Sequence, residues 1–578
     1  MMARRFIFFI TACFACIVLY TLTVLHSDVH ASNWIFRVAP SGSEDPIFSW
    51  LLEILAQERL RSWGDVLDAG TGEASFSWLL SQRFLSLTGV TATSSGTYGA
   101  DRLISKLSLA LNGPANITVG NWKDEELLAN RSFDVVLCDY LIGTAEQFWK
   151  YSADELLARL SKKVKANGYL LLVGLEPYHL ILSPASAHDR IFLKMEMVGD
   201  VAALLAGRPT YRELPERWVA WQVEHLKEFR IVERKHFQVK LKKQHLRRQL
   251  DWAAEQARFI TDKSVRAAFS THIQSLKKTL TTLRKHGRAR NYAFVLQRVG
   301  PSSIMPSLGT AHQLTSPRLG PEAGDELWGW LAAFVQKQCS GRDEGWGEVL
   351  DAGTGPTSLA WLLKQRHRSL TAVTAWSVQR EEVEKMLEHD IHNTPEVLLG
   401  EWSDPTLLEG RAFDIVLSEY VIGASEYFSQ YYQEEVFARI LSLVKVGGLL
   451  LLVGMQPFEY VDDEHVDPGV VEALRIRDAA LLLSRYKAYR EYPDSWCERQ
   501  IQRSGSFEIL AKKWFPKQKG QDFLTTQLDW AKREAAHISD TAIQKALLTR
   551  ISKLSVSSGQ TVSAGYDYVF VVKRIKKK

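Results

Sequence analysis

The chain repeats itself almost from end to end, and this duplication limits its possible folds more than any other feature. Val66–Gly72 (VLDAGTG) recurs as Val349–Gly355, and Tyr292–Leu296 (YAFVL) recurs as Tyr568–Val572 (YVFVV), at offsets of 283 and 276 residues. A nearly constant offset over such a length indicates duplication of a whole domain, not an array of short repeats. In this chain of 578 residues we predict a first domain over 40–300, a linker rich in Gly, Pro and Ser over 301–317, and a second domain over 318–575.

Within each copy, short apolar runs alternate with amphipathic segments. In the first copy the pattern predicts strands at 65–68, 87–93, 117–119, 133–138, 169–174 and 292–297, with helices at 75–83 and 101–111 and a mostly helical stretch over 252–288. Runs such as VVLC and LLLVG suit strands that are buried on both faces. Alternating strands and helices predict the α/β class, here two doubly wound, mostly parallel (Rossmann-like) sheets in tandem.

The N-terminal segment is apolar enough to cross a membrane. Phe6–Leu25 contains no charged residue and follows Arg4 and Arg5. Twenty helical residues span about 30 Å, the thickness of a bilayer core. We therefore predict a transmembrane signal anchor over residues 1–35 and a single-pass membrane protein of the endomembrane system. The alternative is a cleaved signal peptide, with an exit at Val29–Ala31, and a secreted protein.

Charge and cysteine content exclude some classes of function. The formal net charge is only +5, from 71 basic and 66 acidic residues, which argues against a nucleic-acid partner. The five cysteines fit neither a disulfide framework nor zinc spacing. Asp462–His465 is an acidic cluster that could bind a metal or be a solvated loop. Because the first copy has no equivalent, we expect no metal.

Both copies place glycines between a strand and a helix. Gly70 and Gly72, with Gly353 and Gly355 in the second copy, allow a ligand to approach the backbone, and the helix that follows offers free N–H groups. In open α/β sheets ligands bind at the carboxyl ends of strands. The dinucleotide fingerprint G-x-G-x-x-G would need a third glycine, and both copies have serine there.

Three motifs in a fixed order carry a family resemblance. The strand–Asp-x-Gly-x-Gly turn is followed by Phe133–Leu137 and Phe413–Leu417, and then by Lys165–Gly174 and Lys445–Gly454. This arrangement resembles the class I S-adenosylmethionine-dependent methyltransferases, in both copies. The resemblance implies S-adenosylmethionine as cofactor, with its methionine end held by Asp68, Gly70 and Gly72 and by Asp351, Gly353 and Gly355.

The resemblance is weaker on the nucleoside side. The family often ends its second strand with an acid that holds the ribose, whereas this chain has Thr93-Ser94 and Trp376-Ser377. After the third strand, where the resemblance implies adenine contacts, the copies have Asn121-Trp122 and Glu401-Trp402. The tryptophans could cover an adenine ring or could be packing residues.

The fourth and fifth strands end in candidate catalytic residues. Asp139-Tyr140 and Glu419-Tyr420 lie where the family faces the methyl donor, and either carboxylate could accept a proton from the acceptor or could cap the next loop. After the fifth strand the first copy has Glu176 and the candidate substrate residue Tyr178, where the second copy has Gln456 and Phe458. This difference predicts that the first copy is the better catalyst.

A further repeated segment is a candidate for acceptor binding. Tyr211-Arg212 recurs as Tyr489-Arg490, each followed by glutamate. An arginine here could bind a carboxylate or phosphate, or pair with the adjacent glutamate.

Together, these patterns predict an S-adenosylmethionine-dependent methyltransferase acting on an oxygen or nitrogen of a small-molecule acceptor. The alternative is a non-catalytic binding or scaffold protein that keeps the methyltransferase fold. A membrane partner is expected through the N-terminal helix, and no nucleic acid is expected. The oligomeric state does not follow from the sequence.

Overall fold

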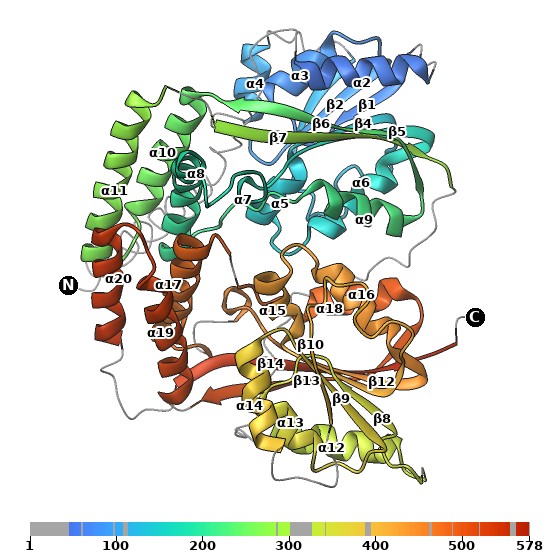
Figure 1. Ribbon diagram of the computed structural model, residues 1–578. Helices are drawn as coiled ribbons and strands as arrows, with labels where there is room; N and C mark the ends of the chain where they lie inside the picture. The colour runs from blue at the N-terminus through green and yellow to red at the C-terminus, as the bar shows by residue number, and fades with distance from the viewer. Residues whose placement is uncertain are drawn as a thin grey trace, which may run out of the picture. The chain divides into compact units, whose positions relative to one another are not determined.

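The computed structural model divides the chain into two compact units (Figure 1). The first contains most of residues 45–300, and the second contains residues 326–576 together with Val201–Arg208 and Gln256–Ser275. The structure describes residues 45–58, 60, 62–95, 99–107, 114–284, 287–300, 326–341, 343–387, 395–461, 465–487, 489–519, 521–554 and 562–576. The predicted linker over 301–317 lies outside these residues.

The first unit follows the predicted alternation of strands and helices. Its strands are β1 (Asp65–Asp68), β2 (Ser86–Thr91), β3 (Ala115–Val119), β4 (Phe133–Asp139), β5 (Val164–Leu175), β6 (Phe229–Leu241) and β7 (Gly287–Arg298). The helices between residues 45 and 300 are α2 (Pro46–Gln57), α3 (Glu73–Leu80), α4 (Ala100–Lys106), α5 (Leu141–Phe148), α6 (Ala153–Lys163), α7 (Tyr178–Ile181), α8 (Ala187–Leu205), α9 (Glu216–Leu226), α10 (Lys243–Ala257) and α11 (Lys263–Thr282).

The second unit repeats this order. Its strands are β8 (Glu348–Asp351), β9 (Ser369–Thr374), β10 (Glu396–Leu399), β11 (Phe413–Glu419), β12 (Val444–Met455), β13 (Phe507–Lys519) and β14 (Val562–Arg574). Its helices are α12 (Glu326–Gln338), α13 (Pro356–Leu362), α14 (Ser377–Leu387), α15 (Val421–Phe428), α16 (Gln433–Ser442), the short η1 (Phe458–Tyr460), α17 (Pro468–Arg485), α18 (Asp494–Ser504), α19 (Gln521–Ala535) and α20 (Thr541–Leu554).

Each unit contains a seven-stranded mixed sheet, in the orders β3-β2-β1-β4-β5-β7-β6 and β10-β9-β8-β11-β12-β14-β13. The first five strands of each order are parallel, and β7 or β14 pairs antiparallel with both of its neighbours. In the first unit, α2, α3 and α4 lie on one face of the sheet and α5, α6 and α9 lie on the other (Figure 1). Covering both faces explains why residues 135–138 of β4 and 169–175 of β5 are buried and almost wholly apolar.

The strand order determines where a ligand can bind. β1 lies between β2 and β4, and β8 between β9 and β11. The two strands that follow β1 in the chain, β2 and β3, lie on one side of it, and the next two, β4 and β5, lie on the other. The second unit has the same arrangement around β8. Such a switch point opens a crevice at the carboxyl ends of the strands, where the glycine turns lie.

The prediction of two tandem, mostly parallel α/β sheets is confirmed. The sequence pattern missed β6 and its counterpart β13. β6 is an edge strand, and many of its side chains, including Arg230, Glu233 and Lys235, are exposed or only half-buried. Charged residues on an edge strand prevent pairing with other chains, and they also remove the alternating pattern by which a strand is recognised.

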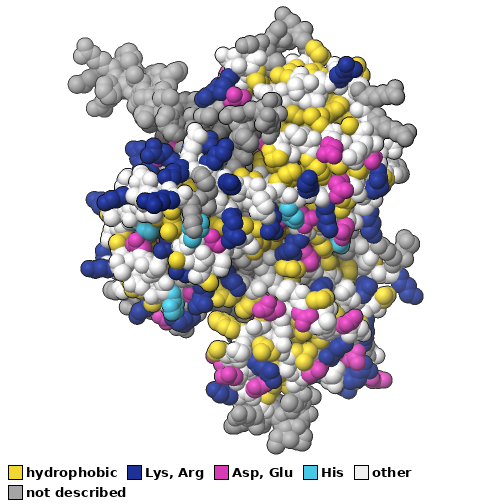
Figure 2. All heavy atoms as spheres, turned by 45° about the horizontal axis from the view of Figure 1, so that its top comes forward, with side chains coloured by type: hydrophobic (Ala, Val, Ile, Leu, Met, Phe, Trp, Pro, Cys, Tyr) yellow, Lys and Arg dark blue, Asp and Glu magenta, His cyan; other side chains and the backbone are white. Residues whose placement is uncertain are grey.

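The prediction of a single-pass membrane protein is corrected. Among the residues that the structure describes, no helix has both the length and the apolar character needed to cross a bilayer. The longest described helices, α8 and α11, carry charged residues such as Lys194, Glu196 and Lys277, which a membrane span disfavours. The predicted anchor over residues 1–35 lies outside the described residues. On the face shown in Figure 2, basic and acidic side chains are both present among apolar ones.

Candidate functional site

The glycine turn is fastened to the strands on both sides of it. In the first unit the backbone N–H of Ala69 donates to Leu137 O at 2.9 Å, and that of Thr71 donates to Val90 O at 2.8 Å. The second unit repeats both bonds, from Ala352 to Leu417 O at 2.8 Å and from Thr354 to Val373 O at 2.7 Å. The turn is therefore held rigidly above the switch point in both units.

The aspartate before each turn accepts hydrogen bonds from hydroxyl groups of the turn and of the helix that follows it. Asp68 and Asp351 are fully buried, and their Oδ2 atoms accept hydrogen bonds from the hydroxyls of Ser75 at 2.8 Å and Ser358 at 2.7 Å. Asp351 Oδ2 also accepts from Thr354 Oγ1 at 2.6 Å. Burial raises the pKa of Asp351 to about 6, although the hydroxyls of Thr354 and Ser358 oppose this rise. Both carboxylates thus organise the turn and do not line the pockets formed by the described residues.

The glycines at the centre of the turns allow the next helix to approach. A Cβ atom on Gly353 would lie 2.4 Å from a methyl carbon of Val421, the first residue of α15. A Cβ atom on Gly70 would lie 3.2 Å from the side chain of Leu141 at the start of α5. A side chain at Gly353 would therefore displace α15.

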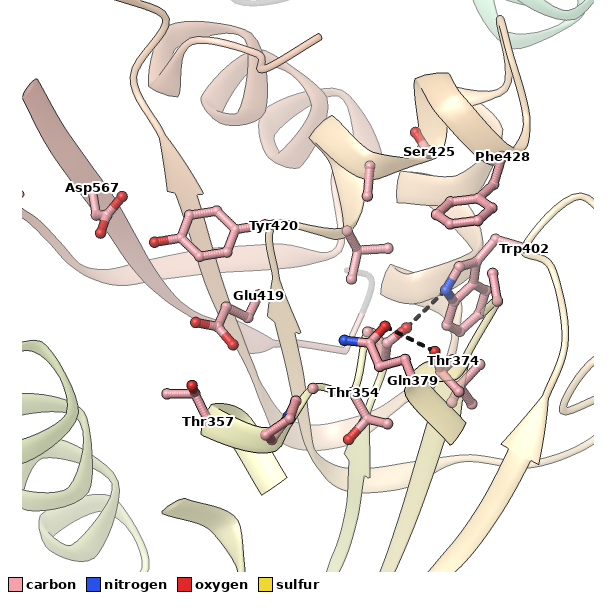
Figure 3. Close-up of a pocket in the computed structure, with 18 of the residues that line it drawn as sticks. Thr354, Thr357, Thr374, Gln379, Trp402, Glu419, Tyr420, Ser425, Phe428 and Asp567 are labelled. Atoms are coloured by element: carbon pink, nitrogen blue, oxygen red, sulfur yellow. Dashed lines mark hydrogen bonds between the residues drawn. The ribbon is translucent and has the colours of Figure 1, made fainter. Parts of the chain in front are cut away.

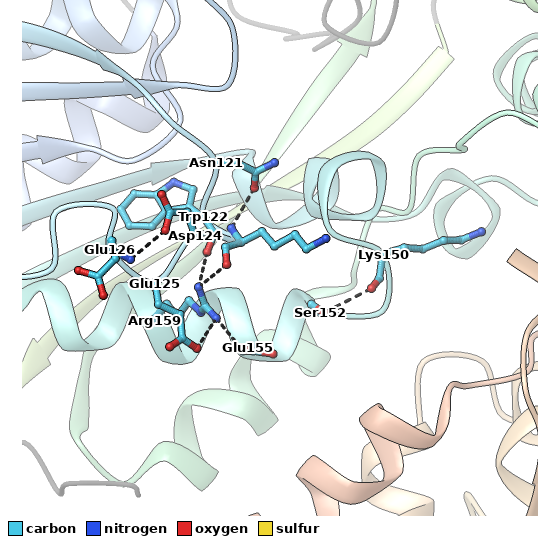
Figure 4. A network of polar contacts seen from close by, with 10 residues as sticks. Asn121, Trp122, Asp124, Glu125, Glu126, Lys150, Ser152, Glu155 and Arg159 are labelled. Atoms are coloured by element: carbon cyan, nitrogen blue, oxygen red, sulfur yellow. Dashed lines mark hydrogen bonds and ion pairs between the residues drawn. The ribbon is translucent and has the colours of Figure 1, made fainter. Parts of the chain in front are cut away.

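A buried tryptophan connects the loop after the third strand to each turn. Trp122 Nε1 donates to Ala69 O at 2.7 Å, and Trp402 Nε1 donates to Ala352 O at 2.8 Å. Arg159 fixes this loop from α6 by donating to Trp122 O and Lys123 O at 2.8 and 2.9 Å (Figure 4). In the second unit Arg439 donates to Trp402 O and to Leu407 O.

The residues that precede these tryptophans, Asn121 and Glu401, differ in whether they line the pocket of their unit. Asn121 lines the pocket of the first unit, and its Oδ1 accepts a hydrogen bond from Lys123 N at 2.9 Å. Glu401 is exposed and is not among the residues that line the second unit's pocket.

The second unit has a pocket of about 450 Å³ above its glycine turn (Figure 3). One end is aromatic, with Trp402 and Phe428, and the other carries the polar groups of Glu419, Tyr420 and Asp567. Further polar side chains line the pocket, namely Thr354, Thr357, Thr374, Gln379 and Ser425. The pocket joins an apolar slot to a charged end, which is the usual composition of a small-molecule site.

A buried lysine organises the polar end. Lys517 Nζ donates to Tyr420 Oη at 2.6 Å and to Asp567 Oδ1 at 2.8 Å, and it also lies over the Tyr420 ring. Lys517 is 5% exposed. Burial and the carboxylates of Asp567 and Glu419 hold the pKa of Tyr420 well above its ordinary value. The phenol therefore stays protonated at neutral pH.

Tyr420 and its counterpart Tyr140 have the left-handed backbone conformation, with φ of 54° and 52°. A non-glycine residue with positive φ stores about 1–3 kcal/mol of strain and is found disproportionately at functional sites. In both units the tyrosine lies directly between the fourth strand and the next helix. This conformation is kept by both copies although the surroundings of the two tyrosines differ.

The first unit has a different polar end. Tyr140 Oη accepts a hydrogen bond from Asn291 Nδ2 at 2.6 Å. Asn291 pairs with Phe237 as Asp567 pairs with Phe515, so it is the counterpart of Asp567. In the sequence Val239 follows Phe237 by two residues, as Lys517 follows Phe515, although the strand register shifts at Lys517. Asp139 is 3% exposed and does not line the pocket of about 60 Å³ that the described residues form.

Glu176, predicted as a catalytic residue, binds the start of a helix. Its Oε1 accepts a hydrogen bond from the backbone N–H of Glu216, the first residue of α9, at 3.1 Å. Gln456 makes the equivalent bond to Asp494 N at 3.0 Å. Since an amide replaces the carboxylate without loss of this bond, the position has a shared structural role.

The predicted substrate residues of both units lie outside the two described pockets. Tyr178 Oη is 3.3 Å from His245 Nε2, which is 3.2 Å from Glu196 Oε1. Tyr211 packs edge-on against Trp252, as Tyr489 does against Trp530 in the second unit. Arg490 lies over the Tyr492 ring. Tyr178, Tyr211, Arg212, Tyr489 and Arg490 do not line the two described pockets.

The sequence analysis considered the glutamate that follows each Tyr-Arg pair only as a possible partner of the arginine. The carboxyl of Glu213 packs on Gly143 in α5, where a Cβ atom would lie 2.2 Å from Oε2, and Glu491 packs on Gly423 in the same way. Burial raises the pKa of Glu213 to about 8 and that of Glu491 to about 7. The retention of Tyr-Arg-Glu in both copies was the available signal.

The structure brings together only part of the predicted site. The second unit's pocket is lined by the predicted residues Gly353, Gly355, Trp402, Glu419 and Tyr420. The first unit's pocket is lined by the predicted residues Gly70, Asn121 and Trp122. The lining residues that the sequence did not suggest include Gln379, Phe428, Ser429, Lys517 and Asp567.

No protein-family model matches the sequence, and no curated protein matches it. Solved structures similar to this chain include a putative methyltransferase from Bacillus halodurans, 19% identical, which covers 42% of this chain and 97% of its own with a TM-score of 0.28. A loganic acid methyltransferase solved with SAH is 12% identical and covers 43% of this chain and 92% of its own, with a TM-score of 0.32. The mycolic acid cyclopropane synthase CmaA1, also solved with SAH, is 14% identical and covers 42% and 83%, with a TM-score of 0.27. The class of fold predicted from the sequence, two mostly parallel α/β sheets in tandem, is confirmed by the strand order.

Proposed function

We propose that this chain is an S-adenosylmethionine-dependent methyltransferase that acts on an oxygen or nitrogen of a small-molecule acceptor. The pocket of the second unit is the observation that carries the proposal. Its volume of about 450 Å³ lies in the range of small-molecule and cofactor sites, about 300–1,000 Å³. It lies at the switch point and joins an aromatic end to a carboxylate end, as a nucleoside with a reactive group would require.

The lining residues fit the parts of the cofactor. Trp402 and Phe428 offer apolar faces for the adenine ring, and the Gly353–Gly355 turn allows the methionine end to approach the backbone. Gln379 lines the pocket from the first turn of α14, with its Oε1 accepting from Thr374 Oγ1 at 3.1 Å. Its amide can hold the ribose hydroxyls where the second strand lacks the usual acid.

The polar end suits the acceptor. When bound, S-adenosylmethionine supplies a sulfonium-linked methyl group, which passes in line to a lone pair of the acceptor as the carbon–sulfur bond breaks. Glu419 is placed to accept the proton that the acceptor oxygen or nitrogen loses. Tyr420 remains protonated and is held by Lys517, so it can orient the acceptor. Positioning of this kind supplies much of the rate enhancement in a displacement reaction.

The experiment compares Glu419→Gln with its matched control Asp139→Asn. We expect E419Q to keep its affinity for S-adenosylhomocysteine in calorimetry and to lose about 10²–10⁴-fold in methyl transfer from labelled cofactor to a panel of hydroxyl and amine acceptors, because general-base catalysis is removed. D139N should transfer methyl groups at the wild-type rate, because Asp139 does not line the described pocket.

Two results would contradict the proposal. Absence of cofactor binding by the wild-type chain would exclude a methyltransferase. Binding without transfer to any acceptor would favour the alternative of a non-catalytic binding protein.

A further inference from the structure

The pockets of the two units differ at one position, although the backbone has a similar conformation there. Trp149 ends α5 with φ −153° and ψ 75°, and Ser429 ends α15 with φ −134° and ψ 71°. The backbone N–H of each donates to the carbonyl four residues earlier at 2.7 Å. Since the helix ends match, the two side chains leave the backbone in similar directions, and their size is the main difference.

In the first unit this side chain is large and held in place. Trp149 lines the pocket beside Trp122, and the guanidinium of Arg159 lies 4.3 Å from the centre of its ring. Arg159 is itself fixed by its bonds to Trp122 O and Lys123 O. A stacked cation and two carbonyl acceptors therefore hold the indole at the nucleoside end of the pocket.

In the second unit the same position is small and polar. Ser429 lines the pocket, is 5% exposed, and its hydroxyl oxygen has no hydrogen-bond partner among the residues that the structure describes. Leaving a buried hydroxyl without a partner costs free energy, because its hydrogen bonds to water are lost. A ligand with a donor or acceptor at this end of the pocket would recover that cost.

The volumes of the two pockets agree with the sizes of Trp149 and Ser429. The described pocket of the first unit measures about 60 Å³, against about 450 Å³ in the second. Next to the glycine turn, Leu141 lines the first pocket and the smaller Val421 lines the second.

We infer that each chain binds a single molecule of cofactor, in the second unit, and that Trp149 closes the corresponding place in the first. The inference rests on the proposed function, since it identifies which copy performs it. The first unit then keeps the fold and the glycine turn without binding the nucleoside.

The test is calorimetric titration of the full chain with S-adenosylhomocysteine. We expect one molecule per wild-type chain. Ser429→Trp, which copies the first unit, should weaken binding more than 100-fold, whereas the reciprocal Trp149→Ser should leave the dissociation constant of the second unit's site within about twofold. Circular dichroism and thermal unfolding would confirm that each variant is folded.

A second pair of variants tests the inference if S429W does not fold. Ala424 lines the second pocket from α15, and Thr144 lines the first from the equivalent place on α5. We expect Ala424→Phe to abolish binding of S-adenosylhomocysteine and Thr144→Phe to leave it unchanged.

The outcomes separate the inference from the proposed function. Two molecules bound per wild-type chain, retained binding in folded S429W or A424F, or loss of binding in W149S would each overturn the inference and leave a cofactor-binding protein. No binding by the wild-type chain would overturn the proposed function and the inference with it.

Discussion

The two units have the same scaffold and different pocket walls. The bonds that build the scaffold recur almost unchanged: Trp122 and Trp402 donate to the turn carbonyls at 2.7 and 2.8 Å. The wall at the polar end does not recur, since Lys517 and Asp567 stand where the first unit has Val239 and Asn291. Both residues of the pair differ between the units. The second unit has a lysine paired with an aspartate, and the first unit has two uncharged residues, so neither unit has an unpaired charge at these two positions.

This comparison shows which residues duplication leaves free to change. A residue that satisfies a buried backbone group can change only to one that keeps the same hydrogen bond. Glu176 and Gln456 differ in charge, and both accept a hydrogen bond from the start of a helix. Trp149 and Ser429 differ in size, and here the difference reaches the pocket.

The largest expected effect concerns the Lys517–Asp567 pair. Lys517→Val leaves the carboxylate of Asp567, whose side chain is 10% exposed, without its cation, and should destabilise the second unit by about 3–5 kcal/mol. Adding Asp567→Asn copies the first unit and should restore most of the lost free energy of unfolding. Urea unfolding of both variants is the measurement. A double variant no more stable than K517V would show that the two polar ends are not equivalent solutions.

A smaller effect concerns the pH dependence of the two buried glutamates. The pKa values in the folded state, about 8 for Glu213 and about 7 for Glu491, lie above the ordinary value of 4.5. The unfolded chain therefore releases these protons first, and stability falls as the pH rises from about 4.5 towards the folded pKa. Between pH 5 and pH 7.5 the loss should be about 3 kcal/mol from Glu213 and about 2 kcal/mol from Glu491.

The pKa of Glu213 is higher than that of Glu491 because the neighbouring charges differ. Asp200 raises the pKa of Glu213 beyond the effect of burial, whereas Lys517 opposes the effect of burial on Glu491. Glu213→Gln and Glu491→Gln should each flatten the pH dependence of their own unit. Amide hydrogen exchange from pH 5 to 7.5 can follow the units separately, and equal slopes in wild type and E213Q would refute the assignment.

The smallest expected effect concerns the helix cap. Glu176→Gln should change stability by less than about 1 kcal/mol and leave methyl transfer unchanged, because Gln456 makes the same bond to its helix. Glu176→Ala removes the acceptor and should cost about 1 kcal/mol or more. Thermal unfolding and the transfer assay measure both. A large loss of transfer in stably folded E176Q would restore Glu176 as a catalytic candidate.

Much of the fold could be predicted from the sequence because its signals are local. The apolar run of β1 and the glycines after it specify a strand, a turn and a helix within a dozen residues, and the structure has β1 at Asp65–Asp68 as predicted. β6 was missed because an edge strand with many exposed charged side chains has no alternating pattern. The candidate site was predicted only in part, since a residue next to a motif need not face the pocket, as Asp351 and Glu401 show.

The sequence by itself determined the duplication, the α/β class and the place of the glycine turn, because each depends on residues that are close together in the chain. Only the tertiary structure decided which side chains meet. Lys517 and Asp567 are 50 residues apart and are brought together by the antiparallel register of β13 and β14. Glu176 finds its partner 40 residues away at the start of α9. Such contacts depend on strand register and helix placement, which packing of the whole unit determines and no local pattern records.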